Sequence, residues 1–257
     1  MNDTSIIISL AAVAVLACIH ILSGIFRVFD GIPRNPLLSF SGGFLVAFVI
    51  LVLLPGLGKG EEILMEKVDS RGFFSYLPHP VYLILFVSLC FFYWTEQVAQ
   101  KALEEREQRP DVHFKVFWLP TLTFAILNCI IGFLLLAKME TGLSALLMFV
   151  IAMVLQFILN DNNLYTKQKE FYNNKGRWIL VMAALIGWGV GAFGSFSDAI
   201  PAISQSFLAG TSLLTVFEKE LPEVQKSNYL AFVLGGVCYV ISLLIINWQS
   251  PKSFGDN

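Results

Sequence analysis

Apolar residues in this chain occur in long runs separated by short polar segments. A bilayer core about 30 Å thick takes roughly 20 helical residues to cross. Eight runs approach or exceed that length, and we expect each of them to be a membrane-spanning helix. The runs cover about 5–26, 37–57, 78–94, 117–137, 142–160, 178–195, 200–217 and 229–248.

The composition supports this interpretation and excludes several classes of function. Hydrophobic residues make up 56% of the 257 residues and charged residues only 14%, whereas a soluble domain carries about 25% charged residues. We therefore expect an all-α polytopic membrane protein, with residues 1–257 as a single domain in the lipid bilayer. The net charge of −2 and the lack of a basic patch argue against nucleic acid as a partner. Without a nucleophile–base pair or a phosphate-binding loop, the chain is not expected to be an enzyme.

The distribution of Lys and Arg predicts the orientation of the chain. Loops one, three, five and seven carry twelve of these residues, and the opposite side carries five. Because cytoplasmic loops are enriched in Lys and Arg, the odd-numbered loops should be cytoplasmic. Both termini should then lie outside the cytoplasm, with the chain in the inner or plasma membrane.

Two of the predicted helices resemble each other. Residues 39–55 read SFSGGFLVAFVILVLLP and residues 206–222 read SFLAGTSLLTVFEKELP, with matching Ser, Phe, Gly, Val, Leu and Pro at one constant offset. Chance likeness between two Leu-rich helices is the alternative, but repeated halves are a common plan for membrane transporters. The two spans are five crossings apart, so they run in opposite directions. The pattern thus predicts a 3+2+3 inverted repeat: repeat A at about 5–94, central helices at about 117–160 and repeat B at about 178–248.

The same two segments are similar to spans of a known family. Ser39–Gly43 through Leu53–Pro55 resembles the second span of the ZIP family of divalent-metal transporters, and Phe207–Gly210 through Leu221–Glu223 resembles the seventh. The eight spans, their orientation and the inverted arrangement also agree with that family. The resemblance implies a homodimeric metal-ion transporter in which spans one, four, five and six move against spans two, three, seven and eight.

The metal-binding positions implied by the resemblance depart from the family pattern. Span four reads LNCIIG at Leu127–Gly132 in place of His-Asn-x-x-acid-Gly, and span five reads VLQFILND at Val154–Asp161 without His, Glu or Pro. Imidazole and carboxylate groups hold zinc and iron, whereas Leu and Ile donate nothing. We therefore assign no metal ligand and expect no cofactor, so that a divalent metal enters only as a transported substrate.

A few polar side chains inside the spans are candidates for a substrate site, because burying such groups in a membrane is costly. They are Asn128 in span four and Gln156, Asn160 and Asp161 in span five. Gln156 and Asn160 are four residues apart and share a helix face. Together with Asn128 they would line a small polar cavity. Alternatively, the same side chains hydrogen-bond between helices and stabilise their packing.

Two further polar positions are read in structural terms. The run Asn160–Asn163 suits the end of a helix, because Asn adopts a left-handed cap readily. His20, late in span one, is interpreted as a packed or snorkelling residue rather than a ligand.

The repeated spans also suggest close helix packing. Gly42, Gly43 and Gly210 are expected where small residues let two helix backbones approach. Pro55 and Pro222 mark the matching ends of the two spans.

These patterns predict a ZIP-like membrane transporter with a degenerate metal site. Two alternatives remain open. One is a carrier of a non-metal small solute, and the other is a non-transporting scaffold or regulatory subunit that binds a membrane-protein partner.

Overall fold

The computed structural model describes residues 3–22, 36–67, 79–105, 114–219 and 228–249, and all regular structure in these ranges is helical. Eight continuous helical segments in this part of the chain are long and apolar enough to cross a membrane, which confirms the predicted all-α bundle. The elements are α1 (Asp3–Leu22), α2 (Pro36–Phe48), the π-helical turn η2 (Val49–Leu53), α3 (Leu54–Lys67), α4 (Pro80–Glu105), the π-helical turn η5 (Phe114–Trp118), α5 (Leu119–Thr141), α6 (Leu143–Phe171), the π-helical turn η6 (Tyr172–Gly176), α7 (Arg177–Phe193), α8 (Ala199–Lys219) and α9 (Tyr229–Gln249).

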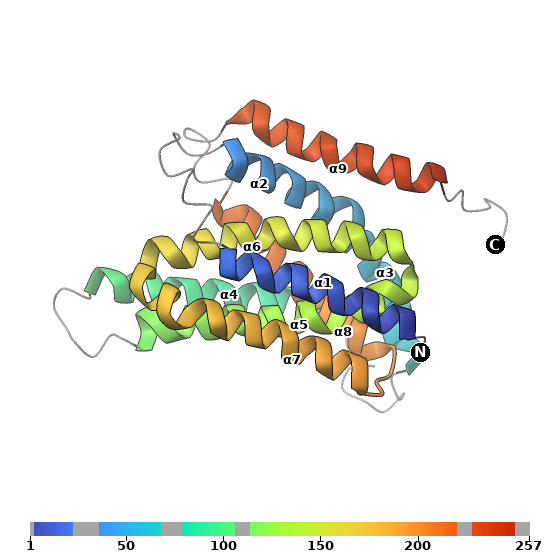
Figure 1. Ribbon diagram of the computed structural model, residues 1–257, viewed down its shortest axis with the longest axis horizontal. Coiled ribbons are helices and arrows are strands. Elements are labelled where there is room, and N and C mark those ends of the chain that lie inside the picture. The colour runs from blue at the N-terminus through green and yellow to red at the C-terminus, as the bar shows by residue number, and fades with distance from the viewer. Residues whose placement is uncertain (1–2, 23–35, 68–78, 106–113, 220–227, 250–257) are drawn as a thin grey trace.

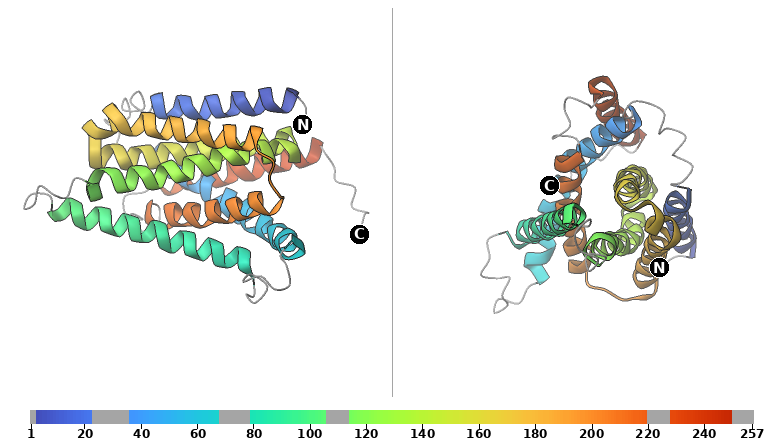
Figure 2. Two further views of the ribbon diagram at one scale, coloured as in Figure 1. Left: turned by 90° about the horizontal axis from the view of Figure 1, so that it is seen from below. Right: turned by 90° about the vertical axis from the view of Figure 1, so that its left-hand side faces the viewer.

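The helices lie side by side along one direction and form two groups (Figures 1 and 2). Helices α1, α5, α6 and α7 pack on one another and form what we call the α1 group. On the other side, α2 packs on α9 and α4 packs on α8, and these helices with α3 form the α2 group. The groups meet where α6 contacts α2 and where α5 contacts α8.

Glycines allow the closest helix contacts in both groups. A Cβ atom added at Gly43 of α2 would lie 1.9 Å from the carbonyl oxygen of Phe232 in α9, and one at Gly210 of α8 would lie 2.3 Å from that of Leu85 in α4. Such distances are far inside van der Waals contact, so only glycine fits. Close packing was expected at both glycines from the sequence. Gly42, next to Gly43 on α2, is also buried.

Pro55 follows the π-helical turn η2 inside the second membrane segment. Proline lacks an amide N–H and its ring crowds the preceding turn. The amide N–H of Leu54, the residue before Pro55, donates a hydrogen bond to the carbonyl oxygen of Val49 five residues earlier, as expected for a π-bulge. The helix continues beyond the proline as α3 to Lys67 instead of ending near residue 57 as the apolar run suggested. Pro222, which the sequence pattern matched to Pro55, lies outside the described residues.

Helix α6 also differs from the sequence-based expectation. The run Asn160–Asn163 lies in the interior of this 29-residue helix, which continues to Phe171. The interpretation of these residues as a helix end is therefore wrong. Asn160 and Asp161 are 4% and 2% exposed, so the helix carries them into the protein interior, where they can form a site.

Candidate functional site

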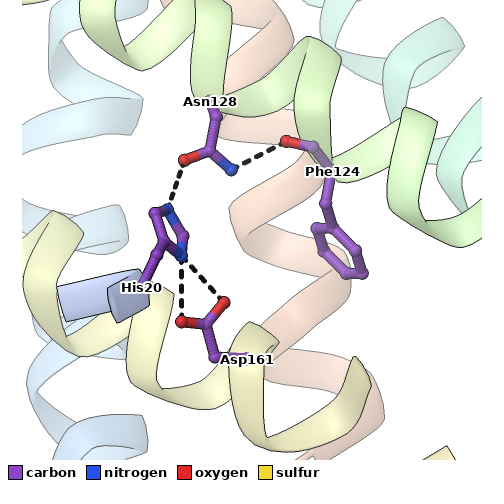
Figure 3. A network of polar contacts seen from close by, with 4 residues as sticks. All are labelled: His20, Phe124, Asn128 and Asp161. Carbon is purple, nitrogen blue, oxygen red and sulfur yellow. Dashed lines mark hydrogen bonds and ion pairs between the residues drawn. The ribbon is translucent and has the colours of Figure 1, made fainter. Parts of the chain in front are cut away.

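His20, near the C-terminal end of α1, is 1% exposed and does not snorkel to the surface. Its Nδ1 atom lies 3.0 and 2.9 Å from the two carboxylate oxygens of Asp161 on α6. Its Nε2 atom lies 2.7 Å from Oδ1 of Asn128 on α5 (Figure 3). The imidazole thus bridges two other helices of the α1 group, and we call these three side chains the histidine network.

The orientation of the Asn128 amide is fixed by its second hydrogen bond. Asn128 Nδ2 donates to the backbone carbonyl of Phe124, one turn earlier in α5, at 2.8 Å. Exchanging the amide nitrogen and oxygen would place two acceptors against each other, so Oδ1 faces His20. The ring of Phe157 stacks on the imidazole with centroids 4.4 Å apart. Polar contacts at its two nitrogens and an aromatic ring against its face hold the imidazole in place.

Gln156 and Asn160 lie one turn apart on α6, at the boundary with α8. Gln156 is fully buried, and its Oε1 accepts a hydrogen bond from Ser212 Oγ of α8 at 3.1 Å. Among the described residues, neither Gln156 Nε2 nor Asn160 Nδ2 has a hydrogen-bond partner. Buried polar groups are nearly always paired, so two unpaired amide donors one turn apart are unusual.

A small pocket adjoins Asn160 between α4, α5, α6 and α8. Its volume of about 20 Å³ offers room for about one water molecule. It lies where the two helix groups meet, and its polar lining consists of Thr95, Glu96, Thr123, Asn160, Asn163, Thr211 and Thr215. Phe124 also lines it, and its carbonyl accepts the hydrogen bond from Asn128 Nδ2, so the pocket and the histidine network meet at this residue.

Charged side chains lie at both ends of the boundary between the groups. Lys167 of α6 forms an ion pair with Glu96 of α4, and both are 14% exposed. At the other end, Lys138 Nζ of α5 donates to Gln205 Oε1 of α8 at 2.6 Å. Together with Gln156, Ser212 and the pocket, these two contacts form a line of polar side chains along the boundary, which we call the polar seam.

The histidine network does not have the geometry of a metal centre. A metal site needs donor atoms that converge on one point. Here the oxygens of Asn128 and Asp161 face opposite nitrogens of His20, so they lie on opposite sides of the ring. Among the described residues, there is also no cluster of three His, Cys, Asp or Glu side chains that could hold a metal ion.

The structure divides the residues chosen from the sequence between two places. Asn128 and Asp161 meet in the histidine network, whereas Gln156 and Asn160 face the polar seam. The single cavity expected for Asn128, Gln156 and Asn160 is thus two adjoining polar regions. His20 was expected to be a packed or snorkelling residue; it is packed, but the sequence did not predict its contacts with Asn128 and Asp161. It also left out Glu96 and Lys167, because both lie beyond the apolar cores of their helices.

Comparison of the sequence with protein-family models and with curated proteins found no match.

Proposed function

We propose that this chain is a membrane transporter for a small solute that carries hydrogen-bond acceptors, and that the solute passes along the polar seam. The observation that carries this proposal is the pair of buried, unpaired amide donors of Gln156 and Asn160. An unpaired buried donor costs about 1–3 kcal/mol, which an acceptor of a bound solute would recover.

The chemistry of the polar seam favours an acceptor over a metal cation. Unpaired N–H groups attract carbonyl, carboxylate or hydroxyl oxygens and repel cations. The Lys138 ammonium contacts an amide oxygen and the Phe149 ring, with no carboxylate partner among the described residues. A positive charge in this position attracts an anionic or strongly polar solute. The proposal therefore replaces the divalent metal implied by the ZIP resemblance.

The division of the bundle into two groups supports a transport mechanism. Transporters often alternate access by moving one group of helices against another around a central site. The α1 group contains spans one, four, five and six, the same set that the ZIP resemblance implies to be mobile. The Lys167–Glu96 and Lys138–Gln205 contacts both join the two groups, one at each end of the polar seam. We propose that they act as gates that break in turn.

An inverted repeat, part of the ZIP-like architecture, is retained within this proposal. In a 3+2+3 inverted repeat, α2 corresponds to α8 and α4 corresponds to α9. The α2–α9 contact then corresponds to the α8–α4 contact. Gly43 and Gly210, which are equivalent in the repeat, lie at these two contacts and each meets a backbone carbonyl. With odd-numbered loops cytoplasmic, the Lys167–Glu96 contact is the cytoplasmic gate.

Uptake into proteoliposomes tests the proposal. The panel should contain small carboxylates, neutral polyols and divalent metal ions. Replacing Asn160 by Leu should reduce uptake of one acceptor-bearing solute at least tenfold, because the amide donor is lost. Asn162→Leu is the matched control, since Asn162 is an exposed amide two residues away on the same helix.

Three results would contradict the proposal. One is uptake of divalent metals alone, and another is equal uptake by the Asn160 and Asn162 variants. The third is a folded protein that carries none of the tested solutes, which would favour the membrane scaffold instead.

A further inference from the structure

The hydrogen-bond directions in the histidine network locate one proton without ambiguity. Asn128 Oδ1 can only accept, and it lies 2.7 Å from His20 Nε2. A contact of that length between an acceptor and a ring nitrogen needs a hydrogen, so Nε2 carries one. The imidazole is therefore either the Nε2–H tautomer or the doubly protonated cation.

The contact on the other side of the ring needs a second proton. Nδ1 lies 2.9 Å from the nearer carboxylate oxygen of Asp161. If neither atom carried a hydrogen, a nitrogen lone pair would face a carboxylate, which is repulsive. One proton must lie between them, on Nδ1 or on the carboxyl group. In both cases the pair has no net charge.

The surroundings make this neutrality important. Both side chains are almost fully buried at membrane depth, where an uncompensated charge is costly. Removal of the shared proton leaves a net charge of −1 and a repulsive contact between α1 and α6. The proton can therefore leave only when water reaches the pair, and its return restores the neutral network.

The pair and the pocket beside the cytoplasmic gate lie next to each other on α6, because Asp161 follows Asn160, which lines the pocket with Glu96. Titratable or charged side chains on this half of the packed helices are Cys18 on α1, Tyr93, Glu96, Lys101 and Glu104 on α4, Cys129 on α5, Tyr165, Lys167, Lys169 and Glu170 on α6, Tyr172 and Lys175 on η6, and Arg177 on α7.

We propose that His20 and Asp161 form a proton-binding site that holds one proton while the histidine network is dry, and that releases it when the α1 group moves away from the α2 group and water reaches the pair. The pair then supplies the proton that drives solute movement, a role that rests on the proposed transport function. The proton adds to the anionic imidazole–carboxylate pair and gives the neutral pair.

Acid–base titration of the purified protein tests proton binding without any solute. The wild-type chain should take up one more proton than Asp161→Asn, and the infrared bands of one carboxyl group should be missing from that variant. Asparagine retains the fold here because its amide can donate to Nδ1 of the neutral imidazole. Glu140→Gln, which removes an exposed carboxylate at the other end of the bundle, is the control for infrared assignment.

A second variant keeps the test decisive if Asp161→Asn fails to fold. Asn128→Leu removes the acceptor that holds a hydrogen on Nε2, so the imidazole can place its one hydrogen on Nδ1 against the carboxylate. The pair then no longer needs the second proton, and release should move to lower pH. In proteoliposomes, Asp161→Asn should abolish accumulation driven by a pH gradient while downhill exchange remains.

An unchanged proton count in Asp161→Asn, or release at the same or higher pH in Asn128→Leu, would overturn the inference. Failure of the transport proposal and failure of the proton site give different results. A chain that binds the proton but carries no solute keeps the proton site and loses transport. A chain that carries solute with the same pH-gradient dependence in Asp161→Asn keeps transport and loses the proton site.

Discussion

Replacing His20 by Leu should destabilise the protein far more than replacing Asp161 by Asn, although both changes affect the same contact. In His20→Leu, the Asp161 carboxyl group stays 2% exposed and loses its partner, the imidazole Nδ1 at 2.9 Å. Breaking a buried ion pair by removing one partner costs about 3–5 kcal/mol. That cost lowers the folding equilibrium constant more than 100-fold.

The cost of Asp161→Asn should be much smaller. The new Nδ2 group can donate to Nδ1 of a neutral imidazole while Nε2–H stays on Asn128. A neutral hydrogen bond then replaces the original contact, and such bonds contribute about 0.5–1.5 kcal/mol. We therefore expect a loss of about 1 kcal/mol or less.

The double variant His20→Leu/Asp161→Leu completes the comparison. Buried ion pairs can often be replaced by apolar residues with little loss of stability, or with a gain of about 1–4 kcal/mol. We thus expect the double variant to be more stable than His20→Leu alone. This difference, measured in a double-mutant cycle, separates the cost of a stranded charge from the loss of packing.

Reversible unfolding in mixed detergent micelles, followed by tryptophan fluorescence, provides the measurement. Asn162→Leu, exposed on α6, serves as the control. Equal losses for His20→Leu and Asp161→Asn would refute the reasoning, as would a loss below about 1 kcal/mol for His20→Leu. Either outcome would mean that no charge is stranded when the imidazole is removed.

Three further predictions concern helix packing. Gly187→Ala should lower the free energy of unfolding by at least about 1–3 kcal/mol, because the new Cβ would lie 1.9 Å from the Cys129 carbonyl oxygen. A thermal melt measures this loss. Gly189→Ala is the control and should be neutral or stabilising, because a Cβ there meets open space. Gly43→Ala should separate α2 from α9 by about 1.5 Å, since ordinary contact begins near 3.4 Å; cross-linking of cysteines introduced on the two helices should then decrease, and unchanged cross-linking would contradict the packing. Ser9→Ala should lower the free energy of unfolding by about 0.5–1.5 kcal/mol and alter the tryptophan emission spectrum, because Trp188 Nε1 donates a hydrogen bond to Ser9 Oγ at 3.0 Å. An unchanged emission spectrum would contradict that hydrogen bond.

Glycine contacts show how far local sequence reasoning reaches. Gly43 and Gly210 could be assigned to close contacts from their repeated positions alone, because a small residue at a fixed helical register signals approach by a neighbour. The identity of each neighbour could not be assigned. Phe232 and Leu85 belong to helices whose partners depend on how the whole bundle assembles.

Helix ends show a second limit. The apolar runs located each crossing, because long apolar segments have no stable place in water. They did not locate the ends of α3, α4 and α6, since a helix can continue past its apolar run with polar side chains that are exposed, such as Lys101 and Glu104, or buried, such as Asn160 and Asp161. Asn160 and Asp161 were read as a helix end for this reason, and the structure places them in the core.

The sequence by itself determined that this chain is a helical membrane protein with eight crossings, because hydrophobic length is a property of each segment alone. It also identified Asn128, Gln156, Asn160 and Asp161 as unusual at their depth. Only the tertiary structure decided that His20 lies between Asn128 and Asp161 while Gln156 and Asn160 face α8. The physical reason is that a hydrogen bond depends on positions and directions in three dimensions, and these three helices meet only after residues more than 100 positions apart are brought together.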